Sequence, residues 1–254
     1  MIAIEYQDIV KKYEGSQAYS VDHVSAQIRE GEFITILGSS GCGKTTLLKM
    51  TNRLIDPTEG KIVLFGENIA QVDPVVVRRR MGYVIQQVGL FPHMTVEENI
   101  GIIPKLEGWD KERIHQRVTE LLELVELKPD EYRTRYPSQL SGGQQQRIGL
   151  ARALVTDPKI MLLDEPFGAI DAITRLNLQN ELMRIHQGMN KTFLLVTHDI
   201  NEAFRLGNRV MIMNEGKLLQ FDTPANIIRH PADPFVETLI ASTKEQERFW
   251  EGIL

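Results

Sequence analysis

The feature that most constrains this chain is a glycine-rich loop between an apolar run and a helix-forming segment. Residues 38–45 read GSSGCGKT and match G-x-x-x-x-G-K-[ST] at every fixed position. The run Phe33–Leu37 before the loop predicts a buried strand, and Lys44–Asn52 after it predicts a helix. Glycines let the backbone N–H groups wrap phosphate oxygens, and the N-terminus of the following helix adds positive charge. The sequence therefore predicts a site for a nucleoside triphosphate.

Two side chains of this loop have expected chemical roles. Lys44 is placed to reach the β- and γ-phosphates, and the Thr45 hydroxyl is placed to ligate Mg²⁺. A chance glycine-rich turn is the alternative interpretation. It is disfavoured because a buried strand precedes the loop and a helix follows it.

An acidic pair follows a second apolar run. Residues 159–166 read KIMLLDEP, in which four apolar residues predict a strand and Asp164 lies at its C-terminal end. Ligands bind at that end of α/β sheets, and a carboxylate there supports Mg²⁺ through its water shell. Glu165 follows directly and is a candidate general base that polarises the attacking water. An ordinary surface Asp-Glu pair is the alternative, and the phosphate loop on the same chain makes it less favoured.

A second anion site is predicted at residues 140–144, which read LSGGQ and begin another predicted helix. Ser141 and two glycine N–H groups at a helix N-terminus complement a γ-phosphate. One chain has no evident need for two phosphate clamps. A head-to-tail dimer uses both, because each nucleotide is then held by the loop of one subunit and the serine-glycine turn of the other. An N-capped helix with a Gly-Gly turn is the alternative.

The remaining patterns predict an α/β fold. Ile160–Leu163 and Phe193–Val196 read as buried strands, and the apolar stripe from Leu178 to Met189 between them has helical spacing. This order is typical of a βαβ unit in a parallel sheet. Antiparallel hairpins are expected at Lys61–Phe65 and around residues 210–221. The middle of the chain, from about residue 95 to 155, reads as helical, with Asp110 capping one helix.

The composition excludes several classes of protein. A chain of 254 residues with 42% hydrophobic residues can bury a normal core, and a net charge of −5 argues against a protein that coats nucleic acid. The single cysteine, Cys42, excludes an intramolecular disulfide and a Cys-based zinc cluster. No apolar run approaches the roughly 20 residues that cross a bilayer. The N-terminal segment is already charged at Glu5, so it does not read as a signal peptide.

Taken in order, these motifs resemble those of the ATP-binding-cassette (ABC) ATPases over nearly the whole chain. GSSGCGKTT resembles the Walker A motif of this family, KIMLLDEP its Walker B motif and LSGGQQQR its signature motif. Gln86, in YVIQQVGLFPH, occupies the place of the Q-loop glutamine, and His198, in LLVTHD, that of the switch histidine. Residues 168–171, GAID, depart from the usual D-loop string SALD at two positions but keep Asp171. Tyr13, in KKYEG, matches the aromatic residue that stacks on adenine.

The resemblance implies a set of site residues for ATP and Mg²⁺. The residues expected in catalysis are Glu165, His198, Lys44 and Gln86. Those expected to hold the metal are Thr45, Gln86 and Asp164. Those expected to contact ATP, from one subunit or the other, are Tyr13, Gly38, Ser39, Ser40, Gly41, Cys42, Gly43, Lys44, Thr45, Thr46, Gln86, Ser141, Gly142, Gly143, Gln144 and Asp171.

The resemblance also implies a fold and a mechanism. The expected fold is a P-loop ABC-type nucleotide-binding domain with a parallel-sheet core, an antiparallel β subdomain and an inserted helical subdomain. One domain over 1–254 is expected, with a core at 1–87 and 157–254 and the helical subdomain at 88–156. ATP closes the dimer, hydrolysis reopens it, and the helical insertion transmits the motion to transmembrane partners. No C-terminal regulatory domain is expected, since the chain ends soon after the cassette should; a truncation is the alternative.

Two segments narrow the resemblance further. Residues 136–141, YPSQLS, are similar to importers rather than exporters, and residues 84–100, VIQQVGLFPHMTVEENI, resemble ATPases of the quaternary-amine osmoprotectant group. Their substrates include glycine betaine, choline and carnitine. The implied partners are a second ATPase subunit, most simply an identical chain, transmembrane permease subunits and an extracellular or periplasmic substrate-binding protein, with no nucleic acid. The implied location is the cytoplasmic face of the cell membrane, peripheral through the permease.

Three alternatives stay open at this point. The chain could be an importer ATPase for another small solute such as an amino acid, a soluble non-transport ABC ATPase, or an inactive regulatory subunit. ABC ATPases of chromosome maintenance carry a long coiled coil between the two phosphate motifs, whereas no sustained heptads lie between Gly38 and Ser141. The residues expected in catalysis are intact, which argues against an inactive subunit.

Overall fold

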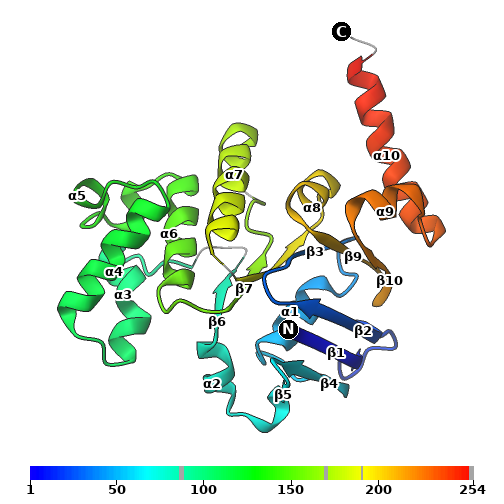
Figure 1. Cartoon of the computed structure of the whole chain (residues 1–254), viewed down its shortest axis with the longest axis horizontal. Coiled ribbons are helices and arrows are strands. Elements are labelled where there is room, and N and C mark those ends of the chain that lie inside the picture. Colours follow the sequence, from blue (N-terminus) through cyan, green and yellow to red (C-terminus); the bar gives the residue numbers. More distant parts are fainter. Residues whose placement is uncertain (86–88, 169–170, 190, 252–254) are drawn as a thin grey trace. The chain divides into compact units, whose positions relative to one another are not determined.

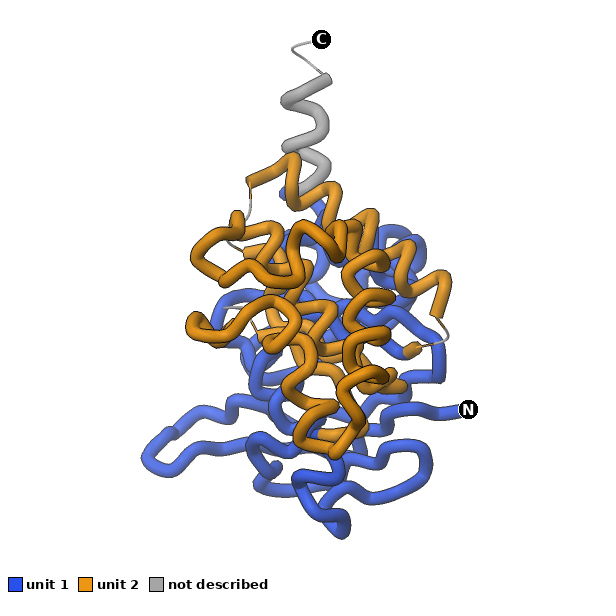
Figure 2. Tube along the Cα trace, turned by 90° about the vertical axis from the view of Figure 1, so that its left-hand side faces the viewer, with its two compact units in different colours: residues 1–78, 192–254 blue, residues 79–191 orange. Residues whose placement is uncertain are grey.

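The chain divides into two compact units. The computed structural model describes residues 1–85, 89–168, 171–189 and 191–251, and of residues 243–251 it describes the backbone alone. Unit 1 comprises Met1–Arg78 with Thr192–Leu254, and unit 2 comprises Arg79–Lys191 (Figure 2). The subdomain boundaries at 87/88 and 156/157 stay a prediction.

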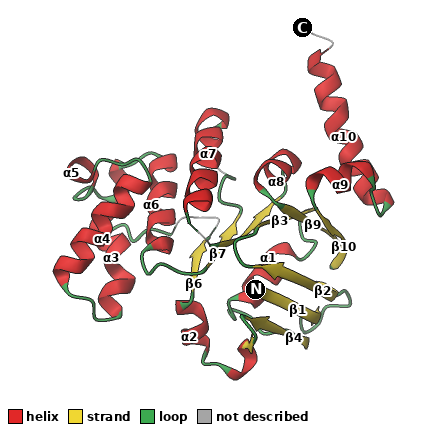
Figure 3. Cartoon of the chain, in the orientation of Figure 1, coloured by secondary structure: helices red, strands yellow, loops and turns green. Residues whose placement is uncertain are grey.

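Strands and helices follow one another along both units (Figures 1 and 3). The strands are β1 (Ile2–Lys11), β2 (Val21–Arg29), β3 (Phe33–Gly38), β4 (Glu59–Leu64), β5 (Glu67–Asn68), β6 (Met81–Val84), β7 (Ile160–Asp164), β8 (Thr192–Thr197), β9 (Arg209–Asn214) and β10 (Lys217–Asp222). The α-helices are α1 (Lys44–Thr51), α2 (Pro74–Arg79), α3 (Val96–Leu106), α4 (Lys111–Leu124), α5 (Pro129–Tyr132), α6 (Gly142–Leu154), α7 (Ala172–Gly188), α8 (Ile200–Leu206), α9 (Pro224–Arg229) and α10 (Pro234–Glu251).

Parallel strands form the centre of unit 1. β3 pairs in parallel with β8 on one side and with β9 on the other, and β10 pairs antiparallel with β9. Every residue of β3 and β8 is buried, which explains why both strands read as nearly continuous apolar runs. Phe33 and Phe193 stack across this pair with ring centroids 5.2 Å apart. The predicted strands Phe33–Leu37 and Phe193–Val196 are confirmed.

Unit 1 also contains an antiparallel sheet with the strand order β2-β1-β4-β5. The predicted strand Lys61–Phe65 corresponds to β4 of this sheet. The sequence patterns do not predict β1 and β2, because bulges interrupt the alternation of inward-facing and outward-facing side chains along these strands. Asp8 and His23 both have φ 52°, and the register of β1 against β2 shifts beside them. The antiparallel β part of the expected fold class is confirmed.

Unit 2 combines a parallel strand pair with helices. β7 pairs in parallel with β6, a strand that the sequence patterns do not predict because it has only four residues. Asp110 caps α4 as expected, accepting the Arg113 N–H at 2.9 Å. Thr95 and Ser141 form capping boxes at the starts of α3 and α6. The predicted helical character of the middle of the chain is confirmed. The expected helix across Leu178–Met189 ends at Gly188, and Met189 is extended.

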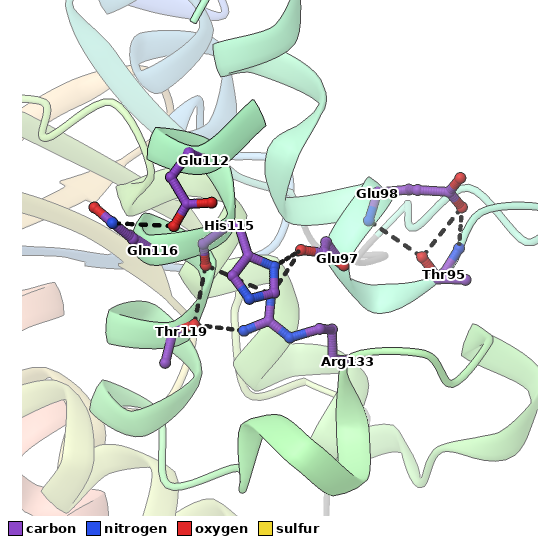
Figure 4. A network of polar contacts seen from close by, with 8 residues as sticks. All are labelled: Thr95, Glu97, Glu98, Glu112, His115, Gln116, Thr119 and Arg133. Atoms are coloured by element: carbon purple, nitrogen blue, oxygen red, sulfur yellow. Dashed lines mark hydrogen bonds and ion pairs between the residues drawn. The ribbon is translucent and has the colours of Figure 1, made fainter. Parts of the chain in front are cut away.

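A largely buried guanidinium connects the helices of unit 2 (Figure 4). Arg133, directly after α5, donates to Glu97 of α3 at 2.6 Å and to the Thr119 hydroxyl of α4. His115 of α4 contacts the same Glu97 carboxylate through Nδ1 at 2.9 Å. The Arg133 side chain is 13% exposed, so these charge-assisted contacts are only weakly screened by water. They fix α3, α4 and α5 relative to one another.

The last helices of the chain pack on unit 1. Apolar side chains of α8, α9 and the first turns of α10 form one buried cluster with strand residues: Leu37, Ala203, Val210, Ile212, Ile227, Val236 and Ile240. In the part of the chain that the structure describes, we find no helix with the length and apolar character that crossing a bilayer requires.

Candidate functional site

The predicted phosphate loop lies in unit 1 between β3 and α1 and curls around the Lys44 ammonium. Nζ of Lys44 donates to the carbonyls of Gly38 and Ser39, both at 2.8 Å. The thiol of Cys42 lies 3.9 Å from the same nitrogen. Lys44 is buried, with 5% of its surface exposed. Its charge is therefore held by loop carbonyls at the place where the sequence predicts phosphate oxygens.

Close backbone contacts require glycine at two positions of the loop. A Cβ at Gly38 would overlap the Met213 carbonyl of β9 and the sulfur of Cys42. Gly43 has φ 104°, and a Cβ there would overlap the Ser20 carbonyl. Only glycine combines this conformation with this packing.

The loop is anchored to the turn between β9 and β10. The Ser39 hydroxyl donates to Oδ1 of Asn214 at 3.0 Å, and the Gly216 N–H donates to the Cys42 carbonyl at 3.1 Å. Cys42 itself is only 4% exposed. The rest of the loop faces outward: Ser39, Ser40 and Gly41 are exposed, and Thr45 and Thr46 are half-buried. A tight backbone ring with an accessible rim fits a nucleotide phosphate chain.

Two further predicted residues lie in unit 1. Tyr13 follows β1 and is 44% exposed, with the Lys11 ammonium 5.3 Å from its ring centroid. His198 is exposed and directly follows β8. Its neighbours are fixed, because the Asp199 N–H donates to Oγ1 of Thr197 at 3.0 Å and this hydroxyl donates to Glu202 at 2.7 Å. The imidazole therefore extends from a rigid strand end.

The acidic pair lies in unit 2. Asp164 ends β7 and is buried, and Glu165 follows with φ 45°, a left-handed conformation that is strained for this residue type. Tyr83 of β6 donates its hydroxyl to Oδ2 of Asp164 at 3.4 Å. Burial raises the pKa of Tyr83 well above its ordinary value, and the Asp164 carboxylate raises it further. Tyr83 therefore stays a hydroxyl donor toward Asp164.

The predicted serine-glycine turn begins α6 of unit 2. The Ser141 side chain accepts the Gln144 N–H at 3.3 Å, and the Gln144 side chain accepts the Ser141 N–H at 2.9 Å. Ser141 and Gly142 are exposed, and a Cβ at Gly142 would meet nothing within 4 Å. Gly143 is different, since a Cβ there would press on Cγ2 of Thr174 in α7. The turn therefore has an open face toward solvent and a close contact with α7.

Two further contacts involve predicted elements of unit 2, one at the start of α7 and one between α6 and the segment after β7. Asp171 caps α7, and its carboxylate accepts the Thr174 N–H at 3.0 Å. This backbone hydrogen bond lowers the pKa of Asp171, so the carboxyl stays ionised at neutral pH. The Gln146 side chain donates to the Pro166 carbonyl, next to Glu165. The signature helix α6 is thus hydrogen-bonded to the segment that carries the acidic pair.

The two units hold different parts of the predicted set. Unit 1 contains Tyr13, residues 38–46 and His198, whereas unit 2 contains the acidic pair, residues 141–144 and Asp171. Gln86 lies outside the described residues. The role expected of each residue stays a prediction.

Two of the residues expected to hold Mg²⁺, Thr45 of unit 1 and Asp164 of unit 2, each carry an oxygen donor of the kind that this ion prefers. Within the described ranges, no three His, Cys, Asp or Glu side chains gather as a metal-binding group. Mg²⁺ typically takes only one or two protein ligands beside phosphates and waters. Thr45 at the start of α1 and Asp164 at the end of β7 are such single oxygen donors.

Comparisons with known proteins decide the family. The sequence profile described as "ABC transporter" matches residues 21–168, more than half of the chain. The chain belongs to the ABC transporter family. The Walker A, Walker B and signature strings identified above all lie inside the matched range.

Curated relatives in this family cover nearly the whole chain. It is 50% identical over 238 residues to the choline transport ATP-binding protein OpuBA of Bacillus subtilis (strain 168), covering 94% of this chain and 62% of OpuBA. It is 45% identical to the osmoprotectant import ATP-binding protein OsmV of Salmonella typhimurium, covering 96% of this chain and 65% of OsmV. It is 46% identical to the glycine betaine uptake system ATP-binding protein YehX of Escherichia coli (strain K12), covering 92% of this chain and 75% of YehX. The chain spans less than two thirds of OpuBA and OsmV.

Solved structures agree with the fold. The dimeric structure of MJ0796, described as a bacterial ABC transporter cassette, superposes with a TM-score of 0.79 at 34% identity and covers 87% of this chain and 98% of that one. A post-hydrolysis state of MJ0796 bound to ADP and Pi has a TM-score of 0.78 at 33% identity, with the same coverage. The expected fold class, an ABC-type nucleotide-binding domain, is confirmed.

Sequence reasoning missed three residues that support the site. Tyr83 lies beside Asp164, Gln146 reaches the segment after it, and Thr174 packs against Gly143. For Gln146 a signal exists, since it belongs to the LSGGQQQR string. No local sequence pattern marks Tyr83 or Thr174, because their contacts with Asp164 and Gly143 arise from strand pairing and helix packing between segments that are far apart in the sequence.

Thiol alkylation tests the geometry of the phosphate loop. Because Cys42 is buried and its sulfur lies beside the Lys44 ammonium, an N-ethylmaleimide adduct is expected to weaken nucleotide binding by at least about tenfold, or 1.4 kcal/mol. Cys42→Ala, treated in the same way, should keep its affinity, since this is the one cysteine of the chain. A fluorescent-nucleotide titration with the adduct counted by mass spectrometry measures both. Full labelling without loss of affinity would contradict the loop geometry.

Proposed function

We propose that this chain binds and hydrolyses ATP as the ATP-binding subunit of an ABC importer. The observation that carries the proposal is that one chain contains two elements whose geometry suits phosphate. One is the loop around Lys44 in unit 1, and the other is the exposed turn at Ser141 and Gly142 in unit 2. A head-to-tail pair of chains gives each nucleotide both elements. The similar MJ0796 cassette is described as a dimer, which supports this arrangement.

Binding of ATP is proposed to use the groups described above. The exposed ring of Tyr13 stacks on the adenine, and the Lys44 ammonium moves from its loop carbonyls to the β- and γ-phosphates. Thr45, Gln86 and Asp164 are the proposed residues for Mg²⁺, which neutralises charge on these phosphates when bound. Tyr83 holds the Asp164 carboxylate in place.

Hydrolysis is proposed to depend on positioning more than on covalent chemistry. Glu165 orients the attacking water and accepts its proton, and the strained backbone at this residue fixes the direction of the carboxylate. His198 contacts the γ-phosphate from the rigid end of β8. Ser141 and the first N–H groups of α6 contact the same phosphate from the other subunit. Loss of the γ-phosphate removes the group that holds the two chains together.

The helical part of unit 2 is proposed to transmit this motion to a permease. A groove of about 730 Å³ is lined by residues of α3, of the start of α4 and of the segment between them, with Ile102 and Ile114 among the apolar ones. Trp109 lines it and stacks on the Arg113 guanidinium, 3.6 Å from the ring centroid. Glu97 and His115 line it too, and they belong to the network that fixes the helices (Figure 4). A stiff groove is suited to receive a cytoplasmic segment of the permease, which would place the chain at the cytoplasmic face of the membrane.

A quaternary ammonium osmoprotectant is the proposed cargo. OpuBA, OsmV and YehX are named for transport of choline, of an osmoprotectant and of glycine betaine, respectively. The segment 84–100 carries the same resemblance. A substrate-binding protein outside the membrane is the proposed source of specificity, since the described residues of this chain serve nucleotide chemistry. The division into a core at 1–87 and 157–254 and a helical subdomain at 88–156 belongs to the same proposal.

Two substitutions test the shared site. Glu165→Gln should bind ATP normally, because the amide keeps the size and hydrogen bonding of the side chain. Its hydrolysis should fall by roughly a hundredfold or more, the effect expected from loss of a general base. A stable dimer should accumulate on size-exclusion chromatography with ATP and Mg²⁺. Hydrolysis at the parent rate would remove Glu165 from this role.

Ser141→Arg tests the other half of the site in the same assays. The larger side chain should block the nucleotide of the partner subunit and abolish the ATP-dependent dimer. ATP binding to the loop of the same chain should persist, because the substitution lies in unit 2 and the loop in unit 1. A Ser141→Arg protein that dimerises and turns over normally would exclude a site built from two chains.

The cargo is tested in vesicles that contain the complete transporter. We expect ATP-driven uptake of at least one of glycine betaine, choline or carnitine, with Lys44→Ala in this chain abolishing it. The control is an amino acid or a sugar offered at the same concentration. Uptake of the control solute, with none of the three quaternary amines, would contradict the proposed cargo.

A further inference from the structure

Helix α6 of unit 2 packs against both α4 and α7 (Figure 1). A cluster of charged side chains links these three helices. Arg147 of α6 donates to the Val125 carbonyl at 2.9 Å, and Arg184 of α7 donates to the Leu124 carbonyl at 2.7 Å. Both carbonyls belong to the C-terminal end of α4, where cations are favoured by the helix dipole. Glu126, in the turn after α4, lies 3.6 Å from each of the two guanidinium groups.

A second carboxylate in this cluster, Glu181 of α7, is buried and poorly satisfied. Its side chain is 3% exposed, and Oε2 lies 3.3 Å from Nη2 of Arg147. Among the described residues, neither carboxylate oxygen has an aligned hydrogen-bond donor. The charged groups facing it are Arg147 from α6, Arg184 from its own helix and Glu126 from the turn after α4. Burial raises the pKa of Glu181 to about 7, and Arg147 offsets only part of this effect.

The position of this ion pair connects it to the signature turn. α6 is capped by Ser141, which is proposed to face the nucleotide of the partner subunit, and α7 is capped by Asp171. Near those ends the helices touch at Gly143 and Thr174, and further along they are joined by Arg147 and Glu181. A small cavity of about 20 Å³ lies beside this ion pair, lined by Arg147 and Leu150 of α6, by Leu178 and Leu182 of α7, and by residues of β6, β7 and the segment after β7.

We propose that Glu181 is a positioning residue whose ionised form holds α6 in register with α7 and so orients the signature turn for the partner's nucleotide. When Glu181 is protonated, Arg147 keeps Val125 and Glu126 as partners, and the pair between α6 and α7 is lost. The turn is then less pre-organised, and closing the dimer costs more conformational entropy. ATP-dependent pairing of two chains should strengthen as the pH rises through about 7. This inference rests on the shared ATP site of the proposed function.

The test measures dimerisation rather than turnover. In a Glu165→Gln background with saturating ATP and Mg²⁺, the dimer dissociation constant is determined by analytical ultracentrifugation at several pH values from about 6 to 8.5. We expect it to fall with rising pH, by up to about tenfold per pH unit and per site below the pKa of Glu181. Adding Glu181→Gln should give weak dimers at every pH and remove most of this dependence. Titration of nucleotide phosphates and histidines is common to both proteins and cancels in the comparison.

Glu126→Gln is the matched control. It removes the other carboxylate beside Arg147, but this side chain is 59% exposed and does not join α6 to α7. The pH dependence of dimerisation should therefore remain.

Urea denaturation at pH 8 distinguishes a positioning role of Glu181 from a role in the stability of the fold. The raised pKa means that the folded state binds the Glu181 proton more tightly than the unfolded state does. The stability that this proton contributes to the fold is fully present below pH 4.5 and is lost as the pH rises through about 7. Glu181→Gln should then be at least as stable as its parent at pH 8.

Each outcome has one interpretation. A pH dependence that Glu181→Gln removes and Glu126→Gln keeps supports the proposal. A flat profile in the Glu165→Gln parent overturns it without any further variant, as does an equal slope in the Glu181→Gln protein. If the Glu165→Gln chain forms no ATP-dependent dimer at any pH, the shared site itself fails, and the role of Glu181 fails with it.

Discussion

The structure depends on one constraint, the close wrapping of the backbone around the Lys44 ammonium. Two loop carbonyls accept hydrogen bonds from Nζ at 2.8 Å. The loop can take this path because Gly38 and Gly43 have no side chain, since a Cβ at either position would overlap a neighbouring backbone carbonyl. The strand before the loop is paired on both edges, with β8 on one side and β9 on the other, and every one of its residues is buried. The turn between β9 and β10 closes the loop through Asn214. These contacts fix the loop that is proposed to bind the nucleotide phosphates.

Unit 2 contains the second proposed anion site, at the start of α6. The capping box of Ser141 and Gln144 supplies hydrogen-bond acceptors for the backbone N–H groups of both residues. Ser141 and Gly142 remain exposed to solvent. Three further contacts control the helix behind it: Gln146 with Pro166, Gly143 with Thr174 and Arg147 with Glu181. Two of these are polar and one is steric. Through Gln146, α6 is hydrogen-bonded to the residue that directly follows Glu165.

Much of this could be predicted because the constraint is local in sequence. Glycine spacing, an apolar run and a capping serine each lie within about ten residues of sequence. These local patterns predict the helix after the phosphate loop, the strand before the acidic pair and the helix at Ser141, and the structure has all three elements. What escaped prediction depends on distant segments. β1 is broken by a bulge at Asp8, and Tyr83 acquires its role only because β6 pairs with β7. The sequence around Glu181 does not distinguish it from an exposed helical glutamate, because its burial and its ion pair with Arg147 come from the packing of α7 against α6.

The central claim is that one nucleotide is held by two copies of this chain. A crystal structure of the Glu165→Gln protein with ATP and Mg²⁺ tests it directly. The account predicts a two-fold dimer in which each γ-phosphate is contacted by Lys44 of one copy and by Ser141 of the other, at hydrogen-bonding distances of about 3 Å. An ATP-bound protein in which Ser141 of neither copy approaches the phosphate, or in which a single chain closes both elements on its own nucleotide, would contradict it.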